Sequence, residues 1–194
     1  MDKKRCGWVG EQQIYRDYHD YVWGRPVFDS QELFAKLCLD GQQAGLSWLT
    51  ILKKQQNYEA AFAHFDPAIV AKFDDAKIEA LLQNKGIVRN RLKVNSIIKN
   101  ARGYMAHFSG IEGEQGQSFS EFLWSFVGGE PKVNHFEDSN QLPVQTPESE
   151  AMSKALKKLG FNFVGPTICY AFMQAVGMVN DHTTDCFCYK NNQK

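Results

Sequence analysis

Two pairs of residues that could bind a metal ion lie at opposite ends of the chain. Cys6 and His19 lie near its start, and His182 and Cys186 lie near its end, in the segment NDHTTDC. Together they form a Cys2His2 set, which suits tetrahedral zinc because zinc binds thiolate sulfur and imidazole nitrogen. Such a site would connect the two ends of the chain, but zinc alone does not indicate a function.

Coincidence explains the same spacing equally well. The chain has five Cys and five His, and a lone cysteine is usually a small buried hydrophobe. Cys38 and Cys169 lie in apolar helical runs and fit that description, while Cys188 is a rival ligand close to Cys186. The four ligands are also too far apart in the sequence for a local zinc finger. The spacing alone therefore leaves both interpretations open.

Aromatic side chains near the start of the chain could form a binding pocket. Trp48 follows a group within the first 23 residues that consists of Trp8, Tyr15, Tyr18, Tyr21 and Trp23. Aromatic rings interleaved with polar residues can stack on a flat base, although most tryptophans are largely buried in a core. Both interpretations hold together if the pocket is a gap within the core.

The segment LDGQQAGLSW, residues 39–48, adds an acidic residue and a small tip. Asp40 lies at the end of an apolar helix, where the helix dipole disfavours a carboxylate. This placement indicates a role beyond helix stability, against the plainer alternative of a loop aspartate with satisfied hydrogen bonds. Gly45 and Leu46 form a tip that could insert into a base stack.

The segment LLQNKGIVRNRLKVN, residues 81–95, could bind phosphate. One helix ends, Gly86 permits a tight turn with positive φ, and a basic amphipathic helix begins. Backbone N–H groups at such a turn can bind an anion, and a clamp of this kind holds DNA without reading its sequence. Six basic residues and no acidic one lie from Lys85 to Arg102, which favours an anionic partner. An ordinary αα-corner with a fortuitously basic surface is the alternative.

The elements that must position these groups are predicted to be almost wholly helical. Capping residues and prolines predict helix starts at Asp29-Ser30, Ser47, Asp66-Pro67, Asp74, Thr146-Pro147 and Gly165-Pro166. Apolar periodicity predicts helices over residues 90–105 and 119–127, whereas residues 109–118 form a polar break, residues 131–146 form a loop, and no strand pattern is found. The expected division is a middle domain of residues 28–108 and a second domain formed by residues 1–27 and 109–194.

Composition limits the class of protein. Of 194 residues, 43% are hydrophobic and 23% are charged, as in an ordinary globular protein long enough to form a core. No apolar run approaches the ~20 residues of a membrane span, and the start has no secretion signal, so no membrane partner is expected. An odd number of cysteines without disulfide spacing indicates a reducing compartment, and the cytoplasm is expected. The zero net charge argues weakly against general nucleic-acid affinity.

Several sequence blocks in combination resemble one protein family. The blocks RCGWV, YHDYVWG, GQQAGLSW, SKALKKLGFNFVG and TICYAFMQAVGMVNDH resemble DNA-3-methyladenine glycosylase I, the Tag family of helix-hairpin-helix DNA glycosylases. The resemblance runs from Cys6 to Tyr189. It implies an all-α helix-hairpin-helix glycosylase fold, with a second helical subdomain, formed by the N- and C-terminal segments, that one structural zinc ion holds together. The implied zinc ligands are Cys6, His19, His182 and Cys186, without Cys188.

The same resemblance implies an enzyme that flips 3-methyladenine out of alkylated double-stranded DNA and hydrolyses its N-glycosidic bond. Free 3-methyladenine and an abasic site would be the products. The implied base pocket consists of Trp8, Tyr15, Tyr18, Trp23, Asp40 and Trp48, with Tyr18 and Asp40 as catalytic residues. The implied DNA contacts are Gly45, Leu46, Lys85, Gly86, Val88 and Arg89. The family's pocket carboxylate is typically Glu, and the shorter Asp40 puts its direct hydrogen bond to the base in doubt.

The expected chemistry needs little acid–base help, because 3-methyladenine in DNA is cationic and already a good leaving group. Tyr18 and Trp48 are expected to stack on the flipped base while Asp40 accepts a hydrogen bond from its exocyclic amine. Residues 87–111 contain no Asp or Glu, although related glycosylases place a catalytic aspartate after the hairpin. A monofunctional hydrolase without a lyase step is therefore expected.

Two other classes of function compete with this one. A non-catalytic protein that binds alkylated DNA could keep the same fold, with Asp40 marking the loss of hydrolysis. A zinc hydrolase is disfavoured, because four protein ligands leave no open position on the metal. A monomer is the simple expectation for the assembly.

Overall fold

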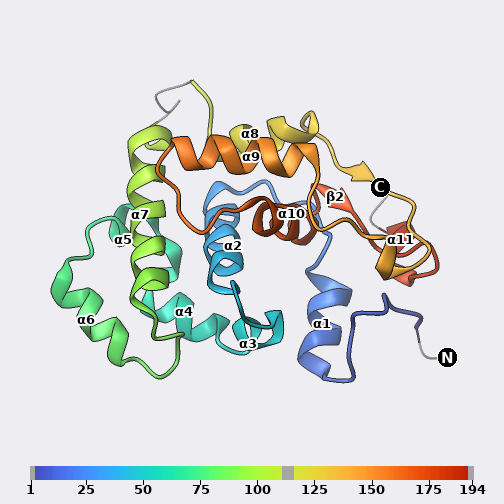
Figure 1. Ribbon diagram of the computed structural model, residues 1–194, viewed down its shortest axis with the longest axis horizontal. Coiled ribbons are helices and arrows are strands. Elements are labelled where there is room, and N and C mark those ends of the chain that lie inside the picture. Colours follow the sequence, from blue (N-terminus) through green and yellow to red (C-terminus); the bar gives the residue numbers. More distant parts are fainter. Residues whose placement is uncertain (1–2, 111–115, 192–194) are drawn as a thin grey trace.

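The computed structural model describes residues 3–110 and 116–191, and helices form most of this part of the chain (Figure 1). The α-helices are α1 (Gln13–Tyr21), α2 (Ser30–Gln42), α3 (Trp48–Leu52), α4 (Gln55–Ala61), α5 (Pro67–Val70), α6 (Asp75–Gln83), α7 (Arg91–Phe108), α8 (Phe119–Trp124), α9 (Pro147–Lys158), α10 (Pro166–Ala175) and α11 (Phe187–Asn191). Within the described residues, three 3-10 helices, η1 (Ala63–Phe65), η2 (Ser125–Val127) and η3 (Ser139–Gln141), complete the helical elements.

The helix starts predicted from capping residues are confirmed. Asp29 accepts a hydrogen bond from the backbone N–H of Glu32 at the start of α2, and Ser47 caps α3 through the N–H of Thr50. Asp66 and Asp74 cap α5 and α6 in the same way. A side chain that accepts from these otherwise unpaired N–H groups stabilises a helix by about 1 kcal/mol, which explains why the caps mark the boundaries. One predicted helix is shorter than expected, because α8 ends at Trp124 and residues 125–127 form the 3-10 helix η2.

Helix α2 lies in the centre of the molecule (Figure 1). It packs against α10, α7, α3 and α8, and the side chains of Leu33, Phe34 and Leu37 are fully buried. Because so many elements surround α2, residues near its end have fixed positions. Asp40 is one of them, in the last turn of the helix.

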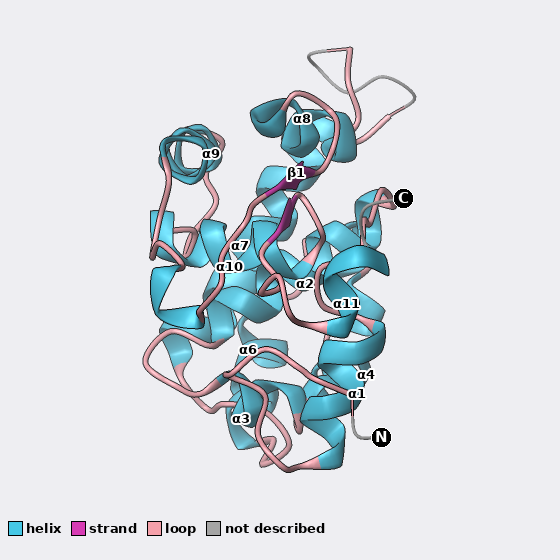
Figure 2. Cartoon of the chain, turned by 90° about the vertical axis from the view of Figure 1, so that its right-hand side faces the viewer, coloured by secondary structure: helices cyan, strands magenta, loops and turns pink. Residues whose placement is uncertain are grey.

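A short parallel ladder corrects the prediction that the chain has no strands. Strands β1 (Lys132–Val133) and β2 (Val179–Asn180) pair with Lys132 opposite Val179, as the two arrows in Figure 2 show. Two residues per strand are too few for an alternating pattern, so the sequence carries no signal for them. The ladder fixes the loop of residues 131–146 beside the C-terminal segment, and this loop contains β1 and η3.

The apolar residues form two clusters. The main cluster includes side chains from both predicted domains, such as Val94 on α7 and Phe172 on α10. The smaller cluster joins Tyr18 and Trp23 of the N-terminal segment to Ala175, Cys186 and Cys188. The division into two domains therefore remains a prediction, although the meeting of the two ends of the chain is observed. Among the described residues, no helix has the length and apolar character needed to cross a membrane.

Candidate active site and metal centre

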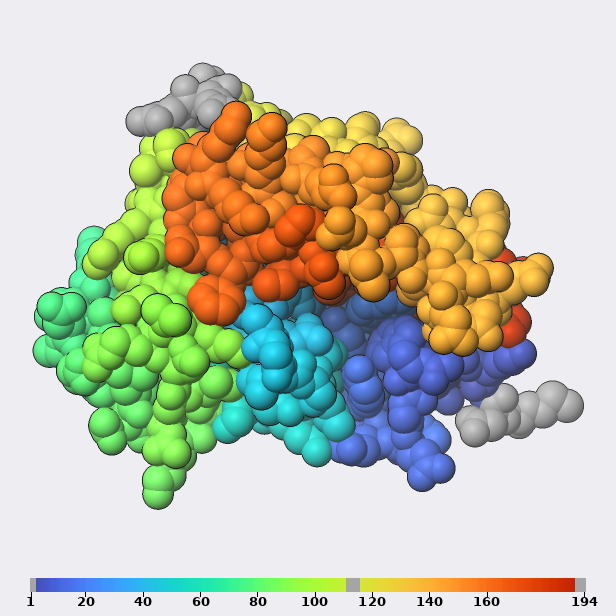
Figure 3. Space-filling model, in the orientation of Figure 1, coloured from blue at the N-terminus to red at the C-terminus, as the bar shows by residue number. Residues whose placement is uncertain are grey.

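A cavity of about 180 Å³ lies among α1, α2, α3 and α10. Its wall consists of Trp8, Tyr15, Tyr18, Trp23, Lys36, Asp40, Gln43, Trp48, Leu142, Ala171, Gln174 and Ala175. All six residues that the sequence predicted for the pocket are in this wall. In the space-filling view the cyan residues that follow α2 lie beside the blue N-terminal segment and below the orange C-terminal segment (Figure 3).

Two aromatic rings and two polar atoms give the cavity its binding character. The rings of Tyr18 and Trp48 have centroids 5.4 Å apart and are tilted by 44°. Asp40 Oδ2 and Trp48 Nε1 are buried and have no hydrogen-bond partner among the described residues. Buried polar atoms are normally paired, because an unpaired one costs about 1–3 kcal/mol. One acceptor and one donor beside two rings suit a flat ligand with polar edges.

Lys36 is a pocket residue that sequence reasoning missed. Its ammonium forms an ion pair with Asp40 Oδ1, one helical turn further along α2, and lies 3.9 Å from the ring centroid of Trp48. Burial raises the pKa of Asp40, and the attraction of Lys36 opposes this rise. Burial also lowers the pKa of Lys36, and Asp40 opposes this fall. The four-residue spacing on one helix face is the signal that could have found Lys36.

Other missed pocket residues come from distant parts of the sequence. Gln43 follows α2, Leu142 follows η3, and Ala171, Gln174 and Ala175 lie on α10. No spacing relates these residues to the N-terminal aromatics, since only the fold brings them together.

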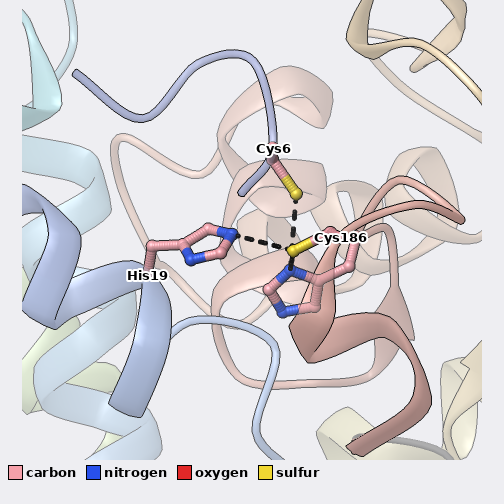
Figure 4. Close-up of side chains that lie close together, drawn as sticks. Cys6, His19 and Cys186 are labelled. Carbon is pink, nitrogen blue, oxygen red and sulfur yellow. Dashed lines mark hydrogen bonds between the residues drawn. The ribbon is translucent and has the colours of Figure 1, made fainter. Parts of the chain in front are cut away.

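The four predicted metal ligands converge in one buried cluster (Figure 4). His182 Nδ1 lies 3.4 Å from Cys6 Sγ and 3.6 Å from Cys186 Sγ, and His19 Nε2 lies 3.5 Å from Cys186 Sγ. A tetrahedral zinc ion with ordinary bond lengths places sulfur and nitrogen ligands about 3.5 Å apart. The spacing and the donor set therefore both fit zinc, and the cluster can hold a metal ion.

Asp20 and Arg5 support this cluster and were also missed. His19 Nδ1 lies 2.8 Å from Asp20 Oδ1, and Arg5 donates to both carboxylate oxygens of Asp20. With its proton on Nδ1, His19 directs the lone pair of Nε2 at the cluster, an arrangement typical of metal-binding histidines. The rival ligand Cys188 lies next to the four, because its thiol forms a second group with His19 and Asp20 and contacts the carbonyl oxygens of His19 and Asp20 at 3.9 Å.

Two tryptophan rings lie between the metal cluster and the cavity. The ring centroid of Trp23 lies 4.7 Å from that of His182 and 6.3 Å from that of His19. Trp8 lies 5.3 Å from His19 and 5.0 Å from Trp23. Since both tryptophans line the cavity, the cluster and the cavity share a wall.

The Gly45–Leu46 tip lies close to the cavity, and its predicted insertion into a base stack stays a prediction. Gly45 has a φ of 74°, a conformation that a residue with a Cβ rarely adopts, and Leu46 is 38% exposed. A second cavity of about 220 Å³ is lined by this tip and also by Asp40 and Gln43. The two cavities therefore adjoin each other at Asp40 and Gln43.

Gly86, in the turn between α6 and α7, does not have the positive φ that the sequence predicted for it. A Cβ at this position would instead lie 2.9 Å from Asn57 Cβ, so close packing requires glycine. Two backbone N–H groups of the turn are already paired, since that of Gly86 donates to Asn84 Oδ1 and that of Val88 donates to the Tyr58 hydroxyl.

A buried polar network connects this turn to the tip after α2. The Tyr58 hydroxyl donates to Gln42 Oε1, and Gln42 Nε2 donates to the carbonyl of Lys93. The Lys93 ammonium donates to the carbonyls of Gln42 at 2.8 Å and Ala44 at 2.6 Å. The carbonyl groups at the end of α2 are therefore satisfied by a side chain of α7.

Part of the basic excess from Lys85 to Arg102 is used inside the protein. Lys93 is buried in the network just described. Arg91 pairs with Glu79 at 2.7 Å, and Arg102 donates to the carbonyls of Ala71 and Phe73. Three of the six basic residues therefore have partners within the protein, of which only Lys93 is buried.

A helical protein with an aromatic cavity, a buried carboxylate and an adjacent glycine–leucine tip has the features expected of a DNA glycosylase. The family profile described as methyladenine glycosylase matches residues 8–189. The chain belongs to the methyladenine glycosylase family.

Relatives and solved structures agree with this assignment over nearly the whole chain. A DNA-3-methyladenine glycosylase of Haemophilus influenzae is 54% identical over 184 residues, which cover 95% of this chain and 97% of the relative. A crystal structure of a 3-methyladenine DNA glycosylase I is 51% identical, with a TM-score of 0.91 and coverage of 96% and 100%. A variant of such an enzyme in complex with 3-methyladenine is 40% identical, with a TM-score of 0.88 and coverage of 94% and 96%.

Proposed function

We propose that the protein removes 3-methyladenine from alkylated double-stranded DNA by hydrolysing its N-glycosidic bond. The observation that carries this proposal is the buried pair of unpartnered polar atoms, Asp40 Oδ2 and Trp48 Nε1, beside the Tyr18 and Trp48 rings. The relative in complex with 3-methyladenine has the same fold. The products are free 3-methyladenine and an abasic site.

In the proposed complex the flipped base stacks on Tyr18 and Trp48, and Asp40 accepts a hydrogen bond from the exocyclic amine. Trp8, Tyr15 and Trp23 complete the aromatic wall. As the glycosidic bond breaks, its electron pair moves to the base and neutralises the positive charge that methylation placed there. Water adds to the sugar carbon and releases a proton to solvent. The base needs no protonated acid to leave, so the pocket contributes by binding and orienting it.

The proposed DNA surface combines the tip and the turn between α6 and α7. Leu46 is exposed beside the cavity and would fill the space that the flipped base leaves in the duplex. Lys85, Gly86, Val88 and Arg89 would bind the backbone phosphates as a helix-hairpin-helix clamp. Because the N–H groups of Gly86 and Val88 already have acceptors, a phosphate would share or replace those two hydrogen bonds.

Zinc would have a structural role in this proposal. Cys6, His19, His182 and Cys186 would hold the ion, and their spacing and burial support it. Four protein ligands leave no position for water or substrate. The ion would therefore fix the aromatic wall and take no part in the hydrolysis.

Chromatography of the bases released from methylated duplex DNA tests the function. We expect a single-turnover release of free 3-methyladenine and intact, uncleaved DNA strands with abasic sites. Retention of the protein on alkylated DNA without release of base would instead identify a non-catalytic binder. Strand cleavage by the protein alone would contradict the monofunctional assignment.

A further inference from the structure

The side chain of Lys36 lines the cavity where the proposed base binds and contacts the groups that would hold the base. Its ammonium pairs with Asp40, lies 3.9 Å from the Trp48 ring centroid and lies 6.0 Å from that of Tyr18. Only 15% of the side chain is exposed. The ammonium thus makes a charge pair and cation–π contacts with the three groups that would bind a cationic methylated base.

The ammonium and a cationic base cannot use these groups at the same time. Two positive charges would share one carboxylate and one ring face, and in a buried site their repulsion is strong. A cationic base that enters the cavity therefore competes with Lys36 for the charge of Asp40.

A neighbouring cavity offers Lys36 a second position. This cavity, of about 250 Å³, is lined by Lys36 itself and by the acidic residues Glu32 and Glu59. Glu32 precedes Lys36 by one helical turn on α2, as Asp40 follows it by one turn, so both carboxylates lie on the same helix face. The flexible four-carbon stem of lysine can reach in either direction.

We propose that Lys36 is a specificity-determining residue that makes entry to the pocket depend on the charge of the base. In the empty pocket it is paired with Asp40, and it moves toward Glu32 and Glu59 when a base enters. A cationic base replaces the ammonium charge for charge, so the pairing of Asp40 is preserved. A neutral base cannot form an ion pair with Asp40, so the loss of the Lys36–Asp40 ion pair lowers the affinity of the pocket for a neutral base. The inference rests on the proposed function, because it assigns the same cavity to the flipped base.

Binding of free adenine, which is neutral at pH 7.5, tests the inference directly. Quenching of the pocket tryptophan fluorescence gives the Kd of adenine for the wild type, Lys36→Met and Lys36→Arg. Lys36→Met keeps a long apolar stem without charge. We expect it to bind adenine about tenfold more tightly, since the neutral base no longer displaces a charged hydrogen-bond partner. Lys36→Arg should stay close to the wild type. An unchanged Kd in Lys36→Met would overturn the inference.

Release of 3-methyladenine provides the second measurement. Because Lys36→Met changes a residue of the pocket, its release of 3-methyladenine in a single turnover is compared with its own affinity for adenine, and we expect the preference for the methylated base over adenine to fall about tenfold relative to the wild type. Equal weakening of both ligands would show a merely structural role and contradict the inference.

The acidic residues of the neighbouring cavity give a test that needs no change at Lys36. The double substitution Glu32→Gln and Glu59→Gln removes the charge of the second position for the ammonium and replaces no residue of the base-pocket wall. We expect a several-fold higher KM for alkylated DNA with little change in kcat, and we expect Lys36→Met to abolish this effect. If the double substitution also raises the KM in the Lys36→Met background, the inference is contradicted.

These outcomes separate the inference from the function on which it rests. If the wild type releases no 3-methyladenine, the proposed function fails whatever Lys36 does. If it releases the base and the preference is unchanged in Lys36→Met, only the inference fails.

Discussion

The ring of Trp23 lies nearly perpendicular to the imidazole ring of His182, at 87°, with centroids 4.7 Å apart. One of these residues lines the cavity and the other belongs to the metal cluster. The position of the cavity wall therefore depends on the metal cluster, so a change at the cluster should also affect the cavity.

Loss of one metal ligand should destabilise the protein and impair the pocket together. Substituting His182→Ala removes a ligand and the ring that Trp23 packs against. We expect a loss of bound zinc, a free energy of unfolding lower by on the order of 4 kcal/mol and little release of base. Zinc analysis and thermal unfolding measure both effects. Cys169→Ala is the matched control, since Cys169 is buried outside the cluster, and it should retain the metal.

Removal of the Asp20 carboxylate should weaken metal binding without removing a ligand. In Asp20→Asn the His19 ring loses the partner that fixes the proton on Nδ1. We expect zinc affinity to fall roughly 10- to 100-fold, measured by competition with a chelator, while the fold is retained at saturating zinc. Unchanged affinity would show that the remaining packing around His19 orients the ring.

Asp40 should control both the rate of base release and its dependence on pH. Asp40→Asn keeps the shape and removes the charge, and we expect release of 3-methyladenine to fall roughly 10- to 100-fold, the contribution of a hydrogen bond to a charged group. Asp40→Glu restores the carboxylate with the length typical of the family and serves as the control. Full activity of Asp40→Asn would remove the carboxylate from the mechanism.

The acid limb of the pH profile follows from the environment of Asp40. Burial raises the pKa of Asp40 and the charge of Lys36 opposes this rise. In the proposed mechanism the carboxylate is the active form, so we expect release to fall as the pH drops through this raised pKa, at a higher pH than for an ordinary aspartate. In Lys36→Met the opposing charge is gone, and the acid limb should move to still higher pH. A shift to lower pH would contradict this assignment.

Lys93 should hold the tip in position for DNA. Lys93→Met leaves the buried carbonyls of Gln42 and Ala44 without their donor. We expect the free energy of unfolding to fall by about 1–3 kcal/mol and the affinity for duplex DNA to fall as well. Lys99→Met is a matched control on the same helix, because Lys99 is exposed, and it tests the loss of charge alone. Equal losses of DNA affinity in both variants would assign the effect to charge rather than to the tip.

Local chemistry made the helix boundaries and much of the site predictable. Caps such as Asp29 and Asp74 act on N–H groups within a few residues, so their effect can be read from the sequence. The resemblance placed the six aromatic and acidic pocket residues, and the cavity contains all of them. The metal cluster is confirmed as a group of neighbours, whereas its zinc ion and the roles of the pocket residues remain predictions.

Long-range packing explains what could not be predicted. Leu142 and Gln174 reach the cavity only because the fold places the loop after η3 and helix α10 there. Gly86 was expected to need a positive φ, but the close approach of Asn57 is what requires glycine. The ladder of β1 and β2 is too short to leave a pattern. Lys36 is an intermediate case. The sequence shows that it precedes Asp40 by one helical turn, but only the fold shows that it lies in the pocket.

The metal cluster also has a consequence for the order of folding. Cys6 and His182 are 176 positions apart in the sequence, and closing so long a loop is slow compared with forming local helices. The cavity takes its wall from residues near both ends, including Trp8 and Gln174. The pocket can therefore close only after helix α10 has been synthesised, because Ala171, Gln174 and Ala175 of that helix form part of its wall.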